Sequence, residues 1–552
     1  MMKQPSDMTE EATTVGGGLQ ALPRREVFIT LAGMMLAMFL ASLDQTVVGT
    51  ALPRIIADLG GFDLYTWVTT AYLITSTTVA PIVGKLTDIY GRKWFYVGGI
   101  VIFLLGSVLS GLSQNINQLI LFRGFQGIGA GAIIASSFTL IGDLFPPAER
   151  GKYQGIIASV FGLSSVIGPT LGGFVTDSLS WRWIFYINIP IGIPVVYLFI
   201  RFFPNIRLTG VNRRIDFLGV TALVLAVMPL LLALSWGGVQ YPWDSMLVIG
   251  SLAFAAVMTG LFIWIESRVT EPLMPLEIFR NRIVSISMLA IFLTGFGMFG
   301  GIIFIPLFFQ GVLGASATTS GSFLTPMMLG MVVGSILSGQ VLSRMGGHYR
   351  IQGLIGLVIM SIGMALLSRM TVDTTFGQAV RNIVLMGFGL GTTMPLFVIA
   401  VQNAVPYRVL GVATTSTQFV RSIGGTLGLA ILGSVMANRF ASTFTTELPA
   451  TVRGALPPER LADLASNPQI LVSPDAQAQL QAGFSQFGPQ GEAMFQQLIT
   501  VMRQSLVFAV AEVFFIGLIV VAVAWLVTLF LKEVPLRKDH QLDSEAEEVL
   551  EG

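Results

Sequence analysis

Long runs of apolar residues, separated by short polar segments, recur along the whole chain. The hydrocarbon core of a bilayer is about 30 Å thick and a helix rises about 1.5 Å per residue, so a spanning helix needs about 20 apolar residues. The runs lack the ten-residue alternation of membrane barrel strands, so we predict α-helices. The fourteen predicted spans are 27–49, 65–84, 95–113, 118–142, 153–176, 183–203, 217–236, 245–265, 284–309, 320–342, 351–368, 382–404, 410–437 and 508–531.

The composition supports an integral membrane protein. Hydrophobic residues make up 53% of the 552 residues and charged residues only 11%, whereas soluble proteins carry about 25% charged residues. The net charge of +1 gives no basic surface for nucleic acid, so we expect no nucleic-acid partner. Cysteine is absent, and the two histidines, His348 and His540, share no motif. We therefore expect no metal site, no catalytic residues and no enzymatic activity.

Lysine and arginine concentrate in alternate connections between the predicted spans. Examples after the second and fourth spans are Lys85, Arg92, Lys93, Arg150 and Lys152. Because short cytoplasmic loops retain basic residues, this pattern predicts a cytoplasmic N-terminus. The even number of spans then predicts a cytoplasmic C-terminus as well. The first 25 residues are polar and lack the apolar core of a signal peptide, so we expect them to form a cytoplasmic tail.

An internal repeat relates the two halves of the chain at a constant offset of 260 residues. The matched residues are Gly127, Gly129, Gly131, Pro146, Gly151, Gly168 and Gly173 with Gly387, Gly389, Gly391, Pro406, Gly411, Gly428 and Gly433. The offset spans an even number of helices, so we predict two six-helix bundles that face the same way, as in two-domain transporters. The predicted divisions are a tail at 1–26, a bundle at 27–205, two inserted helices at 206–280, a bundle at 281–531 with an outer loop at 438–507, and a tail at 532–552.

Small residues four apart predict faces for close helix packing. Gly168 and Gly172 lie on the fifth predicted span, and Gly330, Gly334 and Ser338 lie on the tenth. Such faces allow two backbones to approach closely. Ordinary packing explains the spacing, but two bundles that rock against each other also need smooth surfaces. We therefore expect these faces to form sliding surfaces between the bundles.

Five sequence motifs occur in order along nearly the whole chain. They are Leu43-Asp44-Gln-Thr-Val-Val-Gly49-Thr-Ala-Leu-Pro53, Gly84-Lys-Leu-Thr-Asp88-Ile-Tyr-Gly91-Arg92-Lys93, Arg123-Gly-Phe-Gln126-Gly127, Gly162 to Gly173 with Gly168-Pro169-Thr-Leu-Gly172-Gly173, and Arg421-Ser-Ile-Gly-Gly425. Together they resemble the motifs of the major facilitator superfamily, specifically its fourteen-helix drug:proton antiporter family. Gly49 departs from the asparagine that is usual there. The resemblance implies two six-helix bundles plus two extra helices, and it associates the motif at Gly162 to Gly173 with export.

The resemblance also implies a cytoplasmic gate. Asp88 would meet the N-terminus of the thirteenth span, and Arg92 would pair with Asp143. A carboxylate near a helix N-terminus is favoured by about 0.3–1 kcal/mol, so the contact can act as a latch. The second-half counterpart of the motif, Gly339 to His348, carries Ser343 at the aspartate position, so only the first copy should hold an acidic gate. The alternative is that Arg92 and Lys93 only set the topology.

Four charged residues lie inside the predicted spans, namely Asp44, Arg123, Arg421 and Glu512. Each costs about 2.5 kcal/mol or more at a helix centre and therefore needs a functional or structural reason. Asp44 and Arg123 lie at similar depths, so we expect them to meet. Burial raises the pKa of a carboxyl group, whereas a nearby arginine lowers it, so the two can balance near neutrality. We therefore predict that Asp44 carries the proton. Arg123 stays charged and can only tune Asp44, or it caps backbone carbonyls.

The other two charges have less defined roles. Arg421 lies in mid-span, and the one carboxylate of its bundle that is a candidate partner is Glu512. Because Glu512 lies near the outer edge of the last span, we expect a surface carboxylate, with substrate recognition as the alternative. Phe296, Phe299 and Gln126 are further candidates for contact with substrate or for coupling. Phenylalanine and methionine form adaptable apolar walls, although stripes of them more often face lipid or pack.

We therefore predict a proton-coupled exporter of hydrophobic or amphipathic compounds, of the multidrug efflux type, in the cell membrane. It needs no cofactor, because the proton gradient drives it, and we expect a monomer surrounded by membrane lipid. An ATP-driven pump is disfavoured because the sequence has no GxxxxGK[ST] motif. The alternatives are an exporter of one lipid or metabolite, and a membrane sensor that does not transport. The loop at 438–507 is either a solvated linker with a membrane-lying helix or a docking site for an extracytoplasmic partner.

Overall fold

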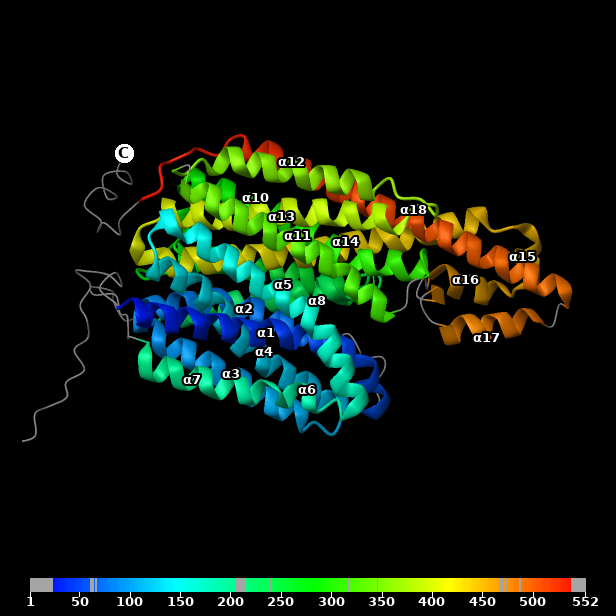
Figure 1. Ribbon diagram of the computed structural model, residues 1–552, viewed down its shortest axis with the longest axis horizontal. Helices are drawn as coiled ribbons and strands as arrows, with labels where there is room; N and C mark the ends of the chain where they lie inside the picture. Colours follow the sequence, from blue (N-terminus) through cyan, green and yellow to red (C-terminus); the bar gives the residue numbers. More distant parts are fainter. Residues whose placement is uncertain are drawn as a thin grey trace, which may run out of the picture.

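The computed structural model describes residues 23–59, 64, 67–203, 215–238, 240–314, 317–344, 346–466, 470–471, 474–485 and 488–537. Most of the two expected tails, and His540, lie outside these residues. Within them the chain is helical almost throughout and forms no β-strand. Figure 1 shows long helices that run roughly side by side along one axis.

The first half of the chain forms a bundle of six long helical segments. They are α1 (Arg24–Leu59), α2 (Trp67–Tyr90), α3 (Arg92–Gly111), α4 (Ile116–Leu144), α5 (Pro147–Ser178), and α6 (Trp183–Tyr186) followed at once by α7 (Asn188–Phe202). Two helices, α8 (Phe217–Trp236) and α9 (Met246–Glu266), follow and pack on each other. α8 also contacts α2 and α14, so the inserted pair lies against the boundary between the two bundles.

The second half forms the other bundle. Its elements are the 3-10 helix η3 (Leu276–Arg280), α10 (Arg282–Gly311), α11 (Ala317–Arg344), α12 (Tyr349–Leu367), α13 (Phe376–Ala404), the 3-10 helix η4 (Tyr407–Val409), α14 (Leu410–Glu447), α15 (Ala450–Ala455), α16 (Pro458–Ser466), α17 (Pro474–Ser485) and α18 (Pro489–Thr528). The long helices α10 to α14 and α18 pack on one another, while α15 to α17 project beyond their ends (Figure 1).

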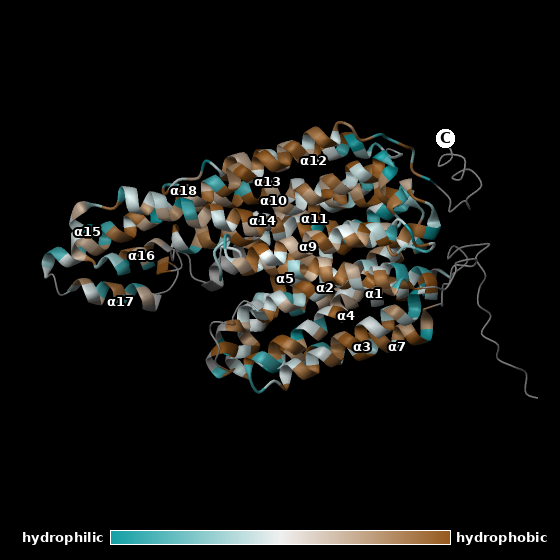
Figure 2. Ribbon diagram, turned by 180° about the vertical axis from the view of Figure 1, so that it is seen from behind, coloured by the Kyte–Doolittle hydropathy of each residue, from teal (hydrophilic) through white to brown (hydrophobic). Residues whose placement is uncertain are grey.

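Every predicted span coincides with helix in the structure. Thirteen segments of the described chain are long and apolar enough to cross a membrane. α2 is helical over the predicted span but is not among them. Its first turns carry several threonines, and it packs between α4 and α14. Figure 2 shows that apolar residues dominate the long helices, while polar residues collect at their ends. The chain is thus a multi-pass helical membrane protein.

The internal repeat appears as equivalent contacts in the two bundles. Gly127 of α4 lies so close to Tyr72 of α2 that a methyl group would overlap it, and Gly387 of α13 meets Met327 of α11 in the same way. Two residues further along each helix, the equivalent glycines pack against α3 and α12. Only glycine permits this approach of backbones. The matched glycines therefore hold the same three-helix arrangement in each half.

Residues 438–507 differ from the predicted loop. α14 continues ten residues beyond its predicted end, and α18 begins at Pro489 rather than at residue 508. Between them, Val452, Leu464 and Phe484 are buried against Phe495 of α18. The solvated linker with a membrane-lying helix is therefore wrong. Residues 493–505 form part of the long α18, and their apolar side chains, such as Phe495, cover this small core.

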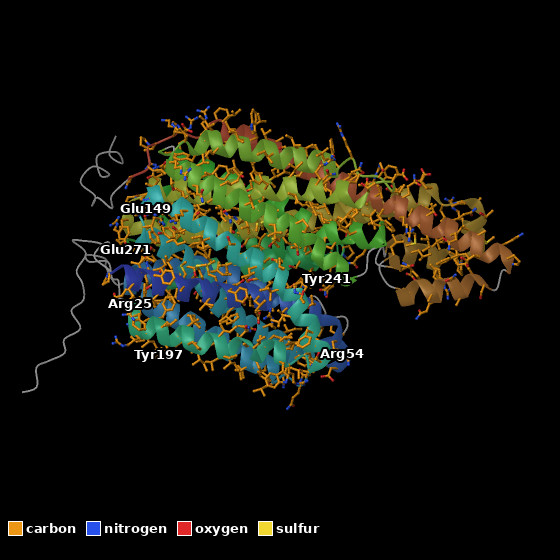
Figure 3. All side chains as sticks on the ribbon, in the orientation of Figure 1. Arg25, Arg54, Glu149, Tyr197, Tyr241 and Glu271 are labelled. Carbon is orange, nitrogen blue, oxygen red and sulfur yellow. The ribbon has the colours of Figure 1, made fainter. Side chains whose placement is uncertain are left out.

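The two ends of the molecule differ in how the bundles meet. We call the end that holds the start of α1 and the end of α18 the terminal face, and the end that holds α15 to α17 the loop face. Figure 3 places Arg25 and Glu149 near the terminal face and Arg54 near the loop face. Among the described residues, every hydrogen bond between the two bundles lies in the half toward the terminal face. The bundles are joined at that face.

Candidate functional site

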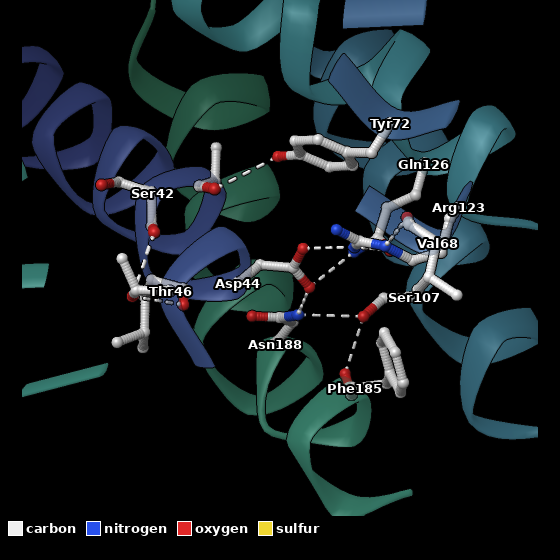
Figure 4. Close-up of polar contacts among 12 residues, drawn as sticks. Ser42, Asp44, Thr46, Val68, Tyr72, Ser107, Arg123, Gln126, Phe185 and Asn188 are labelled. Atoms are coloured by element: carbon white, nitrogen blue, oxygen red, sulfur yellow. Dashed lines mark hydrogen bonds and ion pairs between the residues drawn. The ribbon is translucent and has the colours of Figure 1, made fainter. Parts of the chain in front are cut away.

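A buried carboxylate on α1 is the centre of a polar cluster inside the first bundle. Asp44 Oδ2 lies 2.5 Å from Arg123 Nη1 of α4, and neither side chain is exposed. Its Oδ1 accepts hydrogen bonds from Gln126 Nε2 at 2.9 Å and Asn188 Nδ2 at 3.0 Å. Arg123 Nη1 also donates to Gln126 Oε1 at 2.8 Å. Figure 4 shows Arg123 and Gln126 of α4 and Asn188 of α7 converging on the carboxylate of Asp44.

Aromatic rings and carbonyl groups surround the arginine of this cluster. The Arg123 guanidinium lies 4.3 Å from the ring centre of Tyr72 and 5.9 Å from that of Phe185. Its Nε also approaches the Val68 carbonyl at 3.5 Å. Removing one partner of a buried ion pair typically costs about 3–5 kcal/mol, because the other charge stays buried. The predicted contact between Asp44 and Arg123 is present. The arginine also contacts a backbone carbonyl, that of Val68.

Sequence reasoning missed Asn188 and Ser107 in this cluster. Asn188 is the first residue of α7, and its amide bridges Asp44 and Ser107 Oγ, the latter at 2.9 Å. Ser107 in turn donates to the Phe185 carbonyl at 2.7 Å. Neither residue is charged, so the cost of a charge in a span did not mark them. An isolated amide in an otherwise apolar span, as in Tyr-Ile-Asn-Ile-Pro, was the signal that could have found Asn188, because buried amides need partners.

A second buried cluster lies at the terminal face, where the bundles meet. Asp88 of α2 accepts a hydrogen bond from the backbone N–H of Val412 at 3.1 Å, near the start of α14. Arg92 lies 2.5 Å from Asp88 and 2.8 Å from Asp143 of α4. Tyr407 donates to the other oxygen of Asp143 at 3.0 Å. The predicted gate contacts of Asp88, Arg92 and Asp143 are therefore all present in the structure.

Three glycines make this arrangement sterically feasible. Gly91 has φ +97°, a conformation that other residues rarely adopt, and it lets the chain reverse so that Arg92 faces Asp88. A methyl group on Gly84 would overlap the side chain of Thr415, and one on Gly411 would overlap the carboxylate of Asp88. The second copy of the motif joins the bundles differently, because Gly339 of α11 packs directly on Gly151 of α5.

The sequence of this two-bundle protein matches a known family of membrane proteins. A model of the Major Facilitator Superfamily matches residues 34–429. The chain belongs to the Major Facilitator Superfamily. Members are membrane transporters of small molecules rather than enzymes, and a chain with this many apolar helices is a multi-pass protein of the cell membrane.

Individual members of the superfamily are similar in sequence over most of the chain. Multidrug transporter protein MdtP of Bacillus subtilis is 40% identical over 95% of this chain and 96% of its own length. Multidrug resistance protein 3 of the same organism is 38% identical over 94% of this chain and 98% of its own. Among solved structures, the proton:xylose symporter XylE shares the fold at a TM-score of 0.55, with 13% identity and coverage of 95% and 99% of the two chains.

The helix-five motif of this superfamily member does not form the expected sliding surface. Gly168 and Gly172 pack against Thr46 and Thr50 of α1, within their own bundle. The glycine face of α11 likewise packs within its own bundle, because Gly330 and Gly334 contact α13. The sliding-surface prediction is therefore wrong for both faces. Pro169 lies between the two glycines inside α5, and Gly173 has no neighbour within reach of a methyl group.

The bundles of this transporter instead approach each other along a different part of α5. Gly151, Gly155 and Gly162 face Gly339, Ile336 and Val332 of α11. Of the five motif residues, Gly162 is thus the one whose closest neighbour lies in the other bundle. The spacing pattern correctly marked small residues, but it could not show which neighbouring helix each face would meet.

The remaining candidate residues lie in the second bundle. Arg421 of α14 is buried, and its one hydrogen bond is a long contact of 3.5 Å from Nη2 to the Met394 carbonyl. Glu512 forms an exposed ion pair with Arg439 at 2.9 Å, as expected for a surface carboxylate. Phe296 is buried against Leu432 in a cluster of α10, α14 and α18. The side chain of Phe299 lies outside the described part of the structure.

Proposed function

We propose that this chain exports hydrophobic and amphipathic compounds in exchange for protons, with Asp44 as the proton carrier. The observation that supports this most is the environment of Asp44, whose two oxygens receive bonds from Arg123, Gln126 and Asn188. A transporter of this kind needs one acid that is held in place and can lose and regain a proton. A charged group inside a membrane span is by default a candidate for a proton relay.

Export of several unrelated compounds is the substrate side of the proposal. It rests on the relatives that are named multidrug transporter and multidrug resistance protein, at 38% to 40% identity over nearly the whole chain. The proton gradient supplies the energy, so no cofactor is required. Both bundles belong to one chain, so a monomer in the lipid bilayer is sufficient.

The cluster at the terminal face indicates the side of the membrane to which this conformation is closed. From the concentration of basic residues in the loops at the terminal face, we infer that this face lies in the cytoplasm. Because the bundles are joined at the terminal face by Asp88 and Val412, this conformation is closed to the cytoplasm. Opening requires the Asp88 contacts to break, and protonation of Asp44 in the outward-facing state would precede that step. α15 to α17 then lie outside the cell, where a docking site for another protein remains the alternative to a purely structural role.

Dye transport in inside-out membrane vesicles tests the proposal. A lipophilic fluorescent dye should accumulate in vesicles that contain the protein when their interior is acidic, and a proton ionophore should abolish the accumulation. Vesicles from cells without the protein provide the control. Accumulation that is unaffected by the ionophore would contradict proton coupling, and absence of transport for a broad panel of compounds would favour an exporter of one lipid or metabolite.

A further inference from the structure

Arg421 carries a positive charge inside a span without a carboxylate partner. It lies in the first third of α14, and the residue is 8% exposed. Among the described residues, no carboxylate comes within 4.0 Å of it. Its Nη2 contact to the Met394 carbonyl is at the long limit of a hydrogen bond. A charge at this depth costs several kcal/mol and normally marks a functional group.

The bundle of Arg421 offers no acid to neutralise it. α10, α11, α12 and α13 contain no aspartate or glutamate, and α14 contains only Glu447 at its last position. Glu512 of α18 is paired with Arg439, eighteen residues further along α14, which is about 27 Å at 1.5 Å per residue. Glu512 is therefore excluded as the partner of Arg421.

Among the described residues, the buried acids of the first bundle are already paired. Asp44 is paired with Arg123, and Asp88 and Asp143 are both paired with Arg92. The first bundle thus holds a completed ion pair in its interior, whereas the second holds an arginine alone. This asymmetry between two otherwise equivalent bundles indicates that the second bundle receives its anion from outside the chain.

The guanidinium has donors available for such an anion. Among the described residues, its Nε and Nη1 make no hydrogen bond. The residue keeps 8% of its surface exposed, so its side chain is not sealed off from water or a small molecule. An arginine presents its donors in a planar fork that suits carboxylate, sulfonate and phosphate groups.

We propose that Arg421 binds the acidic group of amphipathic organic anions, which form one class of the exported compounds. This inference rests on the proposed export function and adds a substrate class to it. Asp44 handles the proton in the first bundle, while Arg421 recognises the substrate's negative charge in the second. Compounds without an acidic group would be carried without using Arg421.

A matched pair of dyes tests this assignment with the full-length protein in lipid nanodiscs. 8-Anilinonaphthalene-1-sulfonate carries a sulfonate, and N-phenyl-1-naphthylamine has the same ring system without it. Both fluoresce more strongly on binding, so affinities can be titrated directly. We expect R421Q to weaken sulfonate-dye binding about ten-fold or more and to leave the neutral dye within two-fold. R421K should retain most of the sulfonate affinity, and R439Q on the same helix should resemble the wild type.

Several results would overturn the assignment. Equal loss of both dyes in R421Q and in R421K would show a structural role, and unchanged sulfonate affinity in R421Q would show that another group binds the anion. A wild-type protein that carries the neutral dye but does not bind the sulfonate would overturn this inference while the export function stands. A wild-type protein that transports neither dye nor any compound of the vesicle panel would instead contradict the export function itself. Size-exclusion profiles and melting temperatures establish that each variant is folded.

Discussion

The carboxylate of Asp88 on α2 accepts a hydrogen bond from the backbone N–H of Val412, at the start of α14 in the other bundle. The bond combines a buried negative charge with the positive end of a helix dipole. It also links the motif that holds Arg92 to the helix that carries Arg421. Together with the bond from Tyr407 to Asp143, the contact joins the bundles at the terminal face.

Asp88→Asn should weaken the joined state at the terminal face. The amide oxygen can still accept from Val412, but the ion pair with Arg92 is lost, and we expect a cost of about 1–3 kcal/mol, typical of hydrogen bonds to charged groups. Because the chain contains no cysteine, spin labels can be placed at W94C and I351C, two exposed positions at that face. Electron-electron resonance should show a longer mean separation in the variant. An unchanged distance distribution would contradict the latch.

Gly411→Ala should disturb the same contact by steric overlap. Its methyl group would collide with the Asp88 carboxylate, whereas a methyl group on Gly433 of the same helix meets nothing within 4 Å. We expect G411A to lower the transport rate several-fold and to lower the melting temperature by a few degrees, while G433A behaves as the wild type. Equal effects of the two substitutions would mean that helix propensity, rather than the gate, is responsible.

Asn188→Leu should damage the cluster around Asp44. The substitution removes the amide that donates to Asp44 and Ser107, at an expected cost of about 1.5–3 kcal/mol for a bond to a charged group. We predict at least a ten-fold loss of gradient-driven dye transport, with a lower melting temperature. The matched variant S107A removes one member of the same chain of bonds and should have a smaller effect. Normal transport by N188L would exclude the amide from the coupling site.

Glu512→Gln should have little effect. The Glu512–Arg439 pair is exposed on both sides, and exposed ion pairs contribute about 0–1 kcal/mol. Dye transport and melting temperature should therefore remain close to the wild-type values. A large loss of transport for cationic dyes alone would restore the alternative role of Glu512 in substrate recognition.

The sequence was sufficient to predict the membrane helices because a span must be long and apolar whatever it packs against. It was less informative about α15 to α17, whose short amphipathic segments pack around residues such as Phe484 only after α14 and α18 extend beyond the spans. Hydrophobic length identifies the buried part of a helix but not a polar continuation of it.

The sequence likewise identified some residues of the candidate site and missed others. Asp44 and Arg123 could be found because charge in a span is costly, and Asp88 because of the family resemblance. Asn188 was missed because burying a neutral amide costs less than burying a charge, so the amide stands out less in an apolar span. The partners of Gly168 and Gly172 were misassigned because spacing does not specify the opposing helix. Contacts between helices depend on tertiary packing that a single sequence does not encode in its periodicity.

We propose that Asp44 exchanges the proton that drives export. In proteoliposomes with a pH-sensitive dye inside, addition of a transported compound should cause proton movement with the wild type and with the control D58N, an exposed carboxylate on the same helix. D44N keeps hydrogen-bonding capacity toward Arg123 but has no titratable group, so we predict that it binds the compound and moves no protons. Substrate-induced proton movement at the wild-type rate in D44N would contradict the account.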